Sequence, residues 1–455
     1  MRRWPHQVKY IVGNEACERF SFYGMRSILT VFLADHLLRD LPAAERAPHA
    51  KETFHLFVMA VFFFPLLGGY IADRWWGKYK TILWLSLAYC AGHACLALFD
   101  DVKEGFYLGL FLIALGSGGI KSSVSAFVGD QLTASEKALA PSIFGAFYWS
   151  INLGSFFASL IIPKTLKLYG PRVAFGIPGL LMLVATLIFW LGRRHYKELP
   201  PSGSNPHSFL RVVRSALAAP RSSDPSAHWL DRALASHPSE AVLGAKSVVR
   251  VLKLFAFVPF FWMLFDQKAS AWVLQAKSMD LEVGPFTFEP SQLQFINPAL
   301  VMLLVPFTTG LLYPALDKTR FPLTPVRRMT VGMFMAGLSF VLVALIQIGL
   351  DRGLRLSVAW QLVPYVALTI GEVLVSVTGL EFAYSQAPRE MKGTIMSFWL
   401  LTTAAGNFVV AVVARLNVFS GAASFLFYAA LVSLAGVGIG LVGRKHVSSD
   451  FFRDG

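Results

Sequence analysis

A stripe of charged residues interrupts a stretch that is otherwise apolar enough to span a membrane, from about residue 8 to residue 38. Because an α-helix turns about 100° per residue, the polar members of this stretch fall within about 140° of one face. Ionised groups at membrane depth usually turn towards a bundle interior or a water-filled cavity and mark substrate or ion pathways. An internally neutralised cluster, with Glu15 paired to Arg19, would also explain the pattern. The residues on this face are Glu15, Glu18, Arg19, Phe22, Tyr23 and Arg26.

Ionisable side chains also occur in other apolar segments. His55, Lys121, Asp266 and Glu372 lie within or at the edge of stretches of spanning length. Carboxylates and imidazoles at such positions can take up and release protons. Two simpler explanations stay open: Lys121 reaching for the interface, and His55 as an interfacial histidine. No phosphate loop is present, because the Gly-Lys pair at 77–78 is followed by tyrosine instead of Ser or Thr, so protons are the expected energy source.

The composition is typical of a membrane protein. Hydrophobic residues make up 55% of the 455 residues, charged residues only 15%, and the mean hydropathy is +0.55, whereas soluble domains are about a quarter charged. The net charge of +14 does not indicate a nucleic-acid partner, because the basic residues lie mostly between apolar segments. Cys17, Cys90 and Cys95 form neither a disulfide framework nor a zinc pattern, so we expect no metal and no other cofactor.

Twelve segments have the length and hydropathy of membrane spans, and the expected fold is an all-α polytopic bundle. We divide the chain into a six-helix bundle at 1–192, a linker at 193–250 and a second six-helix bundle at 251–455. The expected spans lie near 9–38, 53–73, 79–99, 105–129, 140–162, 172–192, 251–278, 291–313, 323–349, 356–386, 392–416 and 420–443.

The linker is rich in Pro, Ser and Gly, and its basic residues outnumber its acidic residues. The positive-inside rule therefore places it, and with it both chain termini, on the cytoplasmic side of the cell inner (cytoplasmic) membrane. Residues 207–219 and 228–243 are candidates for amphipathic surface helices.

Two groups of six spans joined by a cytoplasmic linker are typical of two related halves packed about an axis along the membrane normal. The loop after the second span, from Gly68-Gly69 through Asp73-Arg74 to Gly77-Lys78, resembles the cytoplasmic loop motif of the major facilitator superfamily. Gly310 through Asp317-Lys318 to Arg327-Arg328 is its counterpart after the eighth span. This resemblance implies the major facilitator fold, with twelve transmembrane helices in two six-helix bundles.

Further motifs resemble the proton-dependent oligopeptide transporter (POT/PTR) family. The first-helix motif of that family is similar to Glu15-x-x-Glu18-Arg19-Phe20-Ser21-x-Tyr23-Gly24. The fourth, seventh and tenth helices of the family are similar to 116–121, 261–267 and 371–382. The resemblance covers nearly the whole chain except the linker. Asp266-Gln267, residues 384–388 and His55 are similar to the mammalian intestinal and renal peptide transporters, which suggests a bacterial member of that branch.

The family resemblance implies roles for individual residues in peptide binding. A short peptide carries an ammonium group and a carboxylate, so its site needs bases at one pole, an acid at the other and tolerant pockets between them. Arg26 and Lys121 resemble the carboxylate-binding pair, while Glu372, Asn152 and Asn297 match positions associated with the amino end. Tyr23, Trp272 and Trp399 are candidates for lining side-chain pockets, although a core or interface role fits either tryptophan equally well.

Proton coupling is expected from Glu15, Glu18, Arg19 and Asp266, with His55 as a further titratable group. We expect Asp266 to lie away from the Arg26–Lys121 pole and to interact with His55 or with Arg250. Phe22 and Phe62 stand where the family often has tyrosine, which predicts a drier pocket with fewer hydrogen bonds to the peptide.

The favoured function is a proton-coupled symporter that imports di- and tripeptides. The alternative is a proton-coupled carrier of the same fold for nitrate, another organic anion or a peptide-like drug. An enzyme is not expected, because the sequence has no catalytic constellation. The expected partners are peptides, protons and the lipid bilayer, without nucleic acid and without an obligate protein partner.

Overall fold

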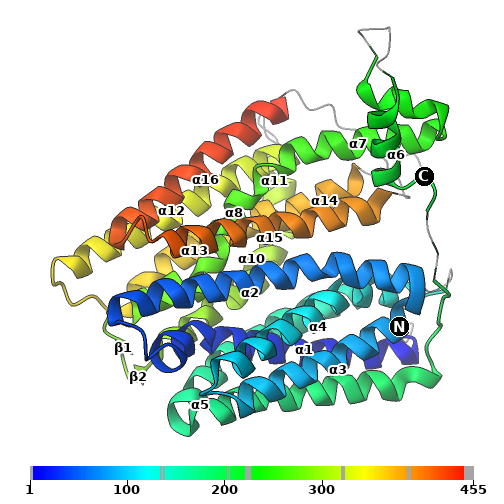
Figure 1. Ribbon diagram of the computed structural model, residues 1–455. Helices are drawn as coiled ribbons and strands as arrows, with labels where there is room; N and C mark the ends of the chain where they lie inside the picture. The colour runs from blue at the N-terminus through cyan, green and yellow to red at the C-terminus, as the bar shows by residue number, and fades with distance from the viewer. Residues whose placement is uncertain are drawn as a thin grey trace.

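The computed structural model describes residues 4–133, 136, 139–201, 203, 205–220, 227–318, 323–386 and 391–444, with only the backbone at 316–317. Helices dominate the described chain, and the one β-element among these residues is the hairpin of β1 (Glu282–Val283) and β2 (Phe286–Thr287) (Figure 1). The expectation of an all-α polytopic protein is therefore confirmed. Residues 387–388 of one motif, several linker positions and the outermost ends of both termini lie outside the described residues.

The first half contains six helical stretches at the expected places. The fifth and sixth stretches form one continuous assignment, α5, that is broken at Gly170, where φ is +78° and Pro171 follows. A positive φ favours glycine, so this residue allows the chain to turn back between the two spans. The helices are α1 (His6–Phe32) with the π-turn η1 (Leu33–Leu37), α2 (Ala43–Ile71) with η2 (Ala72–Trp76), α3 (Gly77–Leu98), α4 (Lys103–Asp130) and α5 (Ala140–Leu191).

The linker packs as a small unit of three helices, α6 (Phe209–Ala218), η5 (Trp229–Ala235) and α7 (Ser239–Phe255). Phe209, Val212 and Ala216 of α6 are buried in one cluster with Leu230 of η5 and Val242 of α7. The amphipathic helix expected at 207–219 is thus present, whereas 228–243 forms a short 3-10 helix and the start of α7.

The seventh span is bent, although the sequence suggested one segment at 251–278. It comprises α7, α8 (Val258–Phe265), η6 (Asp266–Ala269) and α9 (Ala271–Ala276), and its two parts meet at 47°. Pro259 in the first turn of α8 lacks the N–H that a continuous helix would use, which explains the break. The span therefore begins at Ser239, twelve residues before the expected start.

The remaining five expected spans also coincide with helices. They are α10 (Ile296–Phe307) with η8 (Thr308–Leu312) and α11 (Tyr313–Asp317), α12 (Pro325–Asp351), α13 (Leu362–Glu372) with η10 (Val373–Val377) and α14 (Thr378–Ser385), α15 (Lys392–Leu416) and α16 (Gly421–Arg444).

Eight described segments are long and apolar enough to cross a membrane, and the bent seventh span raises this number to nine. Two of the eight, Ala43–Leu98 and Ala140–Arg194, each contain two of the expected spans. The first helix, α1, is not among them, because charged residues interrupt its apolar sequence.

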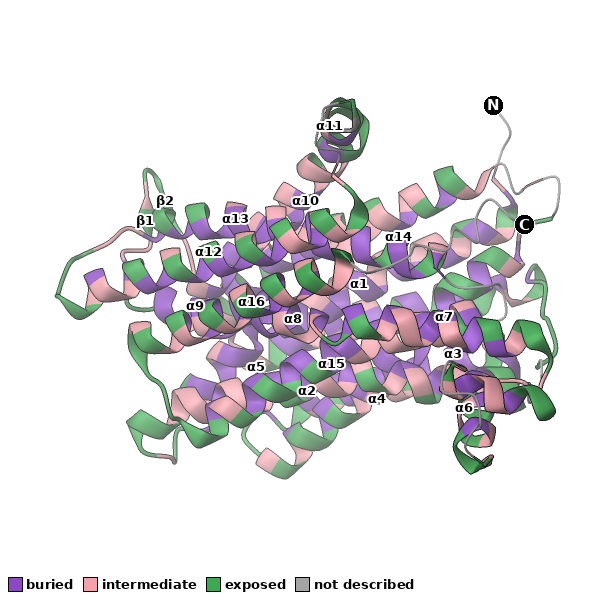
Figure 2. Cartoon of the chain, turned by 90° about the horizontal axis from the view of Figure 1, so that it is seen from above, coloured by how far each residue is buried: buried purple, intermediate pink, exposed green. Residues whose placement is uncertain are grey.

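The two halves of the chain have separate hydrophobic cores, one drawn from residues between 8 and 196 and the other from residues between 209 and 439. Ala269 of the second half is the exception, because it is buried in the first core. The hairpin lies at one end of the molecule and α6 at the other (Figure 1). Buried residues run through the interior of the bundle, and exposed residues occur along its outer sides (Figure 2). The exact division at 192/193 and 250/251 stays a prediction.

The close packing around Gly68 predicts that an added side chain at this position would destabilise the first bundle. A Cβ at Gly68 would lie 2.0 Å from the carbonyl oxygen of Gly119, whereas a Cβ at Gly69 would lie 3.5 Å from Ser122 Oγ. We expect Gly68→Ala to destabilise the protein by about 1–3 kcal/mol through overpacking. Gly69→Ala should be neutral or stabilising by up to about 1 kcal/mol. Unfolding of both variants in detergent tests this, and equal stabilities would contradict the α2–α4 contact.

Candidate functional site

The charged stripe of α1 forms a compact, buried cluster. Arg19 Nε lies 3.1 Å from Glu15 Oε1 and donates a hydrogen bond to Glu18 Oε2. Ser117 of α4 donates to Glu18 Oε1 over 3.4 Å. Only 1% of Glu18 is exposed, so removal of Arg19 would leave a buried carboxylate without its main partner. The pairing of Glu15 with Arg19 is observed, and both acids share that one guanidinium.

Lys121 of α4 completes this side of the site. Its Nζ lies 3.9 Å from the ring centroid of Phe62 and 5.7 Å from that of Phe22. These are the two positions where phenylalanine replaces a family tyrosine. Since an aromatic face attracts a cation, the two rings hold the ammonium group in a largely apolar environment. The drier pocket that the sequence suggested at these positions stays a prediction; the structure adds that both rings lie near a charge.

Arg26 and Asp266 join the two halves of the molecule at the centre of the site. Arg26 Nη2 donates to Asp266 Oδ1, and both side chains are buried. Asn407 of α15 donates to Asp266 Oδ2 over 2.7 Å. His55 of α2 is hydrogen-bonded to Asn407 Oδ1 (2.7 Å) and Ser270 Oγ (2.8 Å). Four helical segments therefore meet around one carboxylate.

This geometry corrects two expectations about Asp266. Asp266 contacts Arg26 directly, so it does not lie away from the carboxylate-binding pole. His55 reaches Asp266 only through Asn407, and Arg250 donates instead to Ser247 within α7. Distance explains the second error, because Arg250 lies sixteen residues before Asp266, which is about 24 Å along a helix and too far for an ion pair even without the bend before α8.

A second polar cluster lies in the second half around Asn297. Asn297 Nδ2 donates to Glu372 Oε2 (2.6 Å) and Thr369 Oγ1 (3.1 Å), and its Oδ1 accepts from Lys268 Nζ (2.7 Å). The ammonium group of Lys268 also lies 3.1 Å from the Phe265 ring centroid. Asn297 thus bridges a half-buried acid and a buried base.

Sequence reasoning missed Lys268 and Asn407. Lys268 could have been found, because it is an ionisable residue two positions after Asp266 in an apolar segment. Asn407 gave no such signal, since an isolated amide in a span is commonly a contact between helices.

The other candidate residues have less direct positions. Asn152 donates to the Tyr148 carbonyl of its own helix, and Tyr23 packs edge-on against Phe22. Trp272 is fully buried against Phe340 and Tyr365. Trp399 packs on Phe255 and Trp262. The core alternative left open for the two tryptophans is therefore the one the structure supports.

Contacts beyond this layer tie the halves together towards the β1–β2 end. Thr30 Oγ1 donates to the Ala269 carbonyl over 2.8 Å, and Lys167 pairs with Glu289 over 2.7 Å. Lys277 pairs with Asp35. Two hollows of about 280 and 270 Å³ lie outside the charged layer, one beside Lys78 and the other beside Asp35 and Glu289.

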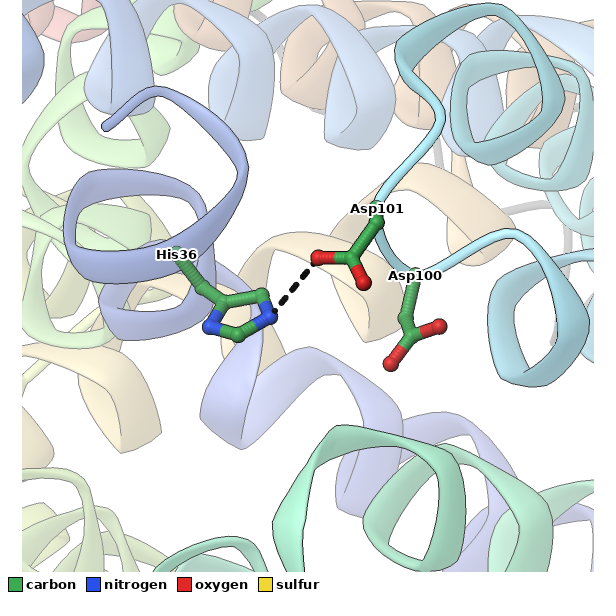
Figure 3. A group of neighbouring side chains, drawn as sticks. All are labelled: His36, Asp100 and Asp101. Carbon is green, nitrogen blue, oxygen red and sulfur yellow. Dashed lines mark ion pairs between the residues drawn. The ribbon is translucent and has the colours of Figure 1, made fainter. Parts of the chain in front are cut away.

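A separate group of His36, Asp100 and Asp101 has oxygen and nitrogen atoms close enough to hold a metal ion (Figure 3). His36 Nε2 lies 3.2 Å from Asp101 Oδ1. Arg172 donates to Asp100 over 3.2 Å, and Arg39 lies 3.6 Å from Asp101. Two guanidinium groups already neutralise these carboxylates, so the group fits a network of ion pairs better than a cation site.

Comparisons with known proteins point in one direction. The model of the POT family matches residues 79–423. Peptide transporter 3 of Caenorhabditis elegans is 38% identical over 77% of this chain and 52% of its own length. Solute carrier family 15 member 2 of Mus musculus is 36% identical over 83% of this chain and 54% of its own length. The chain thus spans about half the length of the curated relatives it matches.

Solved structures match over their full length. The POT family transporter PepTSo is 48% identical, with a TM-score of 0.92 over 98% of this chain and 99% of that chain. An auto inhibited POT family peptide transporter is 46% identical, with a TM-score of 0.92 over 99% of each chain. The major facilitator fold expected from the sequence is therefore confirmed.

The Asn297 cluster predicts energetic coupling between Lys268 and Glu372. Removal of either charge leaves the other buried and poorly compensated, so each single variant should be strongly destabilised. The double variant Lys268→Met/Glu372→Gln should lose about 1–3 kcal/mol less stability than the sum of the single variants. Unfolding in mixed micelles measures this difference.

The exposed pair Lys167–Glu289 is the matched control for this cycle. Because 62% of the Lys167 side chain is exposed, its coupling to Glu289 should stay below about 1 kcal/mol. Additive effects at Lys268 and Glu372 would show that Asn297 does not connect them.

Proposed function

Since the chain belongs to the POT family, we propose that it is a proton-coupled symporter that imports di- and tripeptides by alternating access. The observation that carries this proposal is the buried layer of charges that links α1, α4, η6 and α13 across both halves. Burying charged side chains in a membrane protein costs free energy, and such residues usually mark a pathway for substrates or ions. The protein is then a carrier and not an enzyme.

The peptide poles follow from the two clusters. Lys121 and Arg26 supply positive charge for the peptide carboxylate, and Glu372 with Asn297 receives the ammonium group. Tyr23 and Asn152 lie beside this path. Trp272 and Trp399 support the wall of the second half from its core instead of touching the peptide.

Proton coupling is proposed to act through competition for Arg26. While Asp266 is ionised, it holds Arg26. A proton on Asp266 weakens that pair and releases the guanidinium for a peptide carboxylate. Glu15, Glu18 and Arg19 form the second proton-responsive group, and His55 senses Asp266 through Asn407. Arg250 lies outside this layer. Its part in proton coupling therefore rests on the family resemblance alone.

The proposed setting is the cytoplasmic membrane, with the linker and both termini on the cytoplasmic side and without an obligate protein partner. Uptake of labelled dialanine into liposomes under a proton gradient tests the function. Competition by tripeptides, but not by amino acids or nitrate, is expected. Competition by nitrate alone would favour the alternative of a carrier for another anion.

The two poles predict opposite responses to blocked peptides. Lys121→Ala should abolish concentrative dialanine uptake. The variant should also bind a peptide with a free carboxyl end and a peptide with an amidated carboxyl end equally well. Glu372→Gln should raise the half-saturating peptide concentration, with much less effect on an N-acetylated peptide. Each variant serves as the control of the other in competition binding. The assignment fails if both variants respond alike to both blocking groups.

Asp266→Asn is predicted to abolish proton-driven accumulation of peptide without stopping the exchange of peptide across the membrane. Neutralisation mimics the protonated state, so pH-driven accumulation should largely disappear while gradient-free counterflow of peptide persists. Asp35→Asn, which neutralises the exposed cross-half pair with Lys277, should keep both activities. Proteoliposomes of the three proteins, with thermal stability as a check on folding, provide the comparison. Parallel loss of both activities in Asp266→Asn would assign the residue a structural role.

A further inference from the structure

The linker helix α6 has two dissimilar faces. Phe209, Val212 and Ala216 are buried against η5 and α7. Leu210 and Leu217 lie about 120° around the helix from this buried face and are 72% and 71% exposed. Two such leucines seven residues apart project from the same face of a helix. When α6 packs on the protein, its second apolar face, formed by Leu210 and Leu217, is therefore not buried by any of the described residues.

The exposed face also carries positive charge. Arg214 lies between the two leucines at i+4 from Leu210, and Arg211 flanks them; both arginines are exposed. Residues 207–220 contain no Asp or Glu. Asp231 of the neighbouring η5 is paired with Lys246 at 2.5 Å, and this hydrogen bond lowers the pKa of Asp231. The outward face is thus apolar and cationic together.

A contact with α15 fixes the depth of α6. The ring centroids of Phe209 and Phe398 are 5.6 Å apart. Phe398 lies six residues after Lys392, the first residue of α15, which is about 9 Å along a helix. Since the eleventh span is expected to begin near residue 392, Phe209 contacts a residue just inside the expected cytoplasmic end of that span, so the start of α6 lies at the membrane boundary and not far out in the cytoplasm.

The position of α6 around the bundle is also favourable for lipid contact. Figure 2 shows α6 at the side of the bundle, at the end opposite the β1–β2 hairpin. A helix at this place, with leucines and arginines turned outward, matches the chemistry of interfacial helices, which insert apolar side chains and attract anionic headgroups.

We propose that the outward face of α6, formed by Leu210, Arg211, Arg214 and Leu217, rests in the cytoplasmic leaflet and binds anionic phospholipids. The leucines enter the acyl boundary, and the arginines pair with lipid phosphates. The linker is then a lateral membrane anchor for the second half, in addition to being a connection between the halves.

Quenching by brominated lipids tests the anchor in the full-length protein. A fluorophore is attached at Leu217→Cys after Cys17, Cys90 and Cys95 are replaced by Ala, and the same label at Glu240→Cys, an exposed position of α7, is the control. Bilayers contain phosphatidylcholine and phosphatidylglycerol, with one of the two lipids brominated. We expect strong quenching at position 217, weak quenching at 240, and preferential quenching at 217 by brominated phosphatidylglycerol.

Charge variants separate lipid binding from simple insertion. Arg211→Gln and Arg214→Gln should each lower the preference for phosphatidylglycerol about fivefold, while Leu210→Ser should reduce quenching by both lipids. Mass spectrometry of the unlabelled native-cysteine protein gives a second measure, as fewer bound anionic lipids in Arg211→Gln/Arg214→Gln. Equal, weak quenching at 217 and 240 would overturn the proposal. If position 217 were protected only when a second copy of the protein is present, a contact between copies would replace the proposed lipid contact.

Discussion

The cost of burying charge in a membrane governs the architecture of this protein. Arg26 and Asp266 lie in different halves of the chain, and each is buried because the other is present. Breaking such a pair by removing one partner costs about 3–5 kcal/mol. One of the contacts that hold the two halves together therefore depends on the ionisation of a single carboxylate. Every other contact of Asp266, including the amide of Asn407 and through it His55, adjusts the same balance.

The surrounding apolar packing makes this balance sharp. Phe22 and Phe62 hold Lys121 without a hydroxyl partner from either ring, and Phe265 does the same for Lys268. A cation on an aromatic face keeps its attraction for an anion, because the ring supplies no competing charge. The two lysines are thus held near Glu18 and Glu372 without being fully neutralised, which suits the proposed binding and release of a charged peptide.

The limits of sequence reasoning follow from the same physics. Helical periodicity and hydropathy placed helices at the expected segments of both halves, and the charge stripe of α1 indicated the candidate site, because both are local properties. The Arg26–Asp266 pair joins residues 240 positions apart, so it depends on how the bundles meet. The expectation for Arg250 failed for a simpler reason, because sixteen residues separate it from Asp266, which is about 24 Å along a helix. Trp272 is close in sequence to a site residue, Asp266, and was therefore a candidate for the binding site. In the structure it is buried in the core.

In the proposed cycle, the proton and the peptide need not touch each other to be coupled. A proton on Asp266 and a carboxylate near Arg26 act on the two partners of one ion pair, so each makes the other's binding less costly. Such coupling is reciprocal by thermodynamic necessity, and its size cannot exceed the free energy of the pair that both ligands disrupt. A buried pair is worth more than an exposed one, because water screens it less. In this proposal, the burial of Arg26 and Asp266 thus limits how strongly proton binding and peptide binding can favour each other.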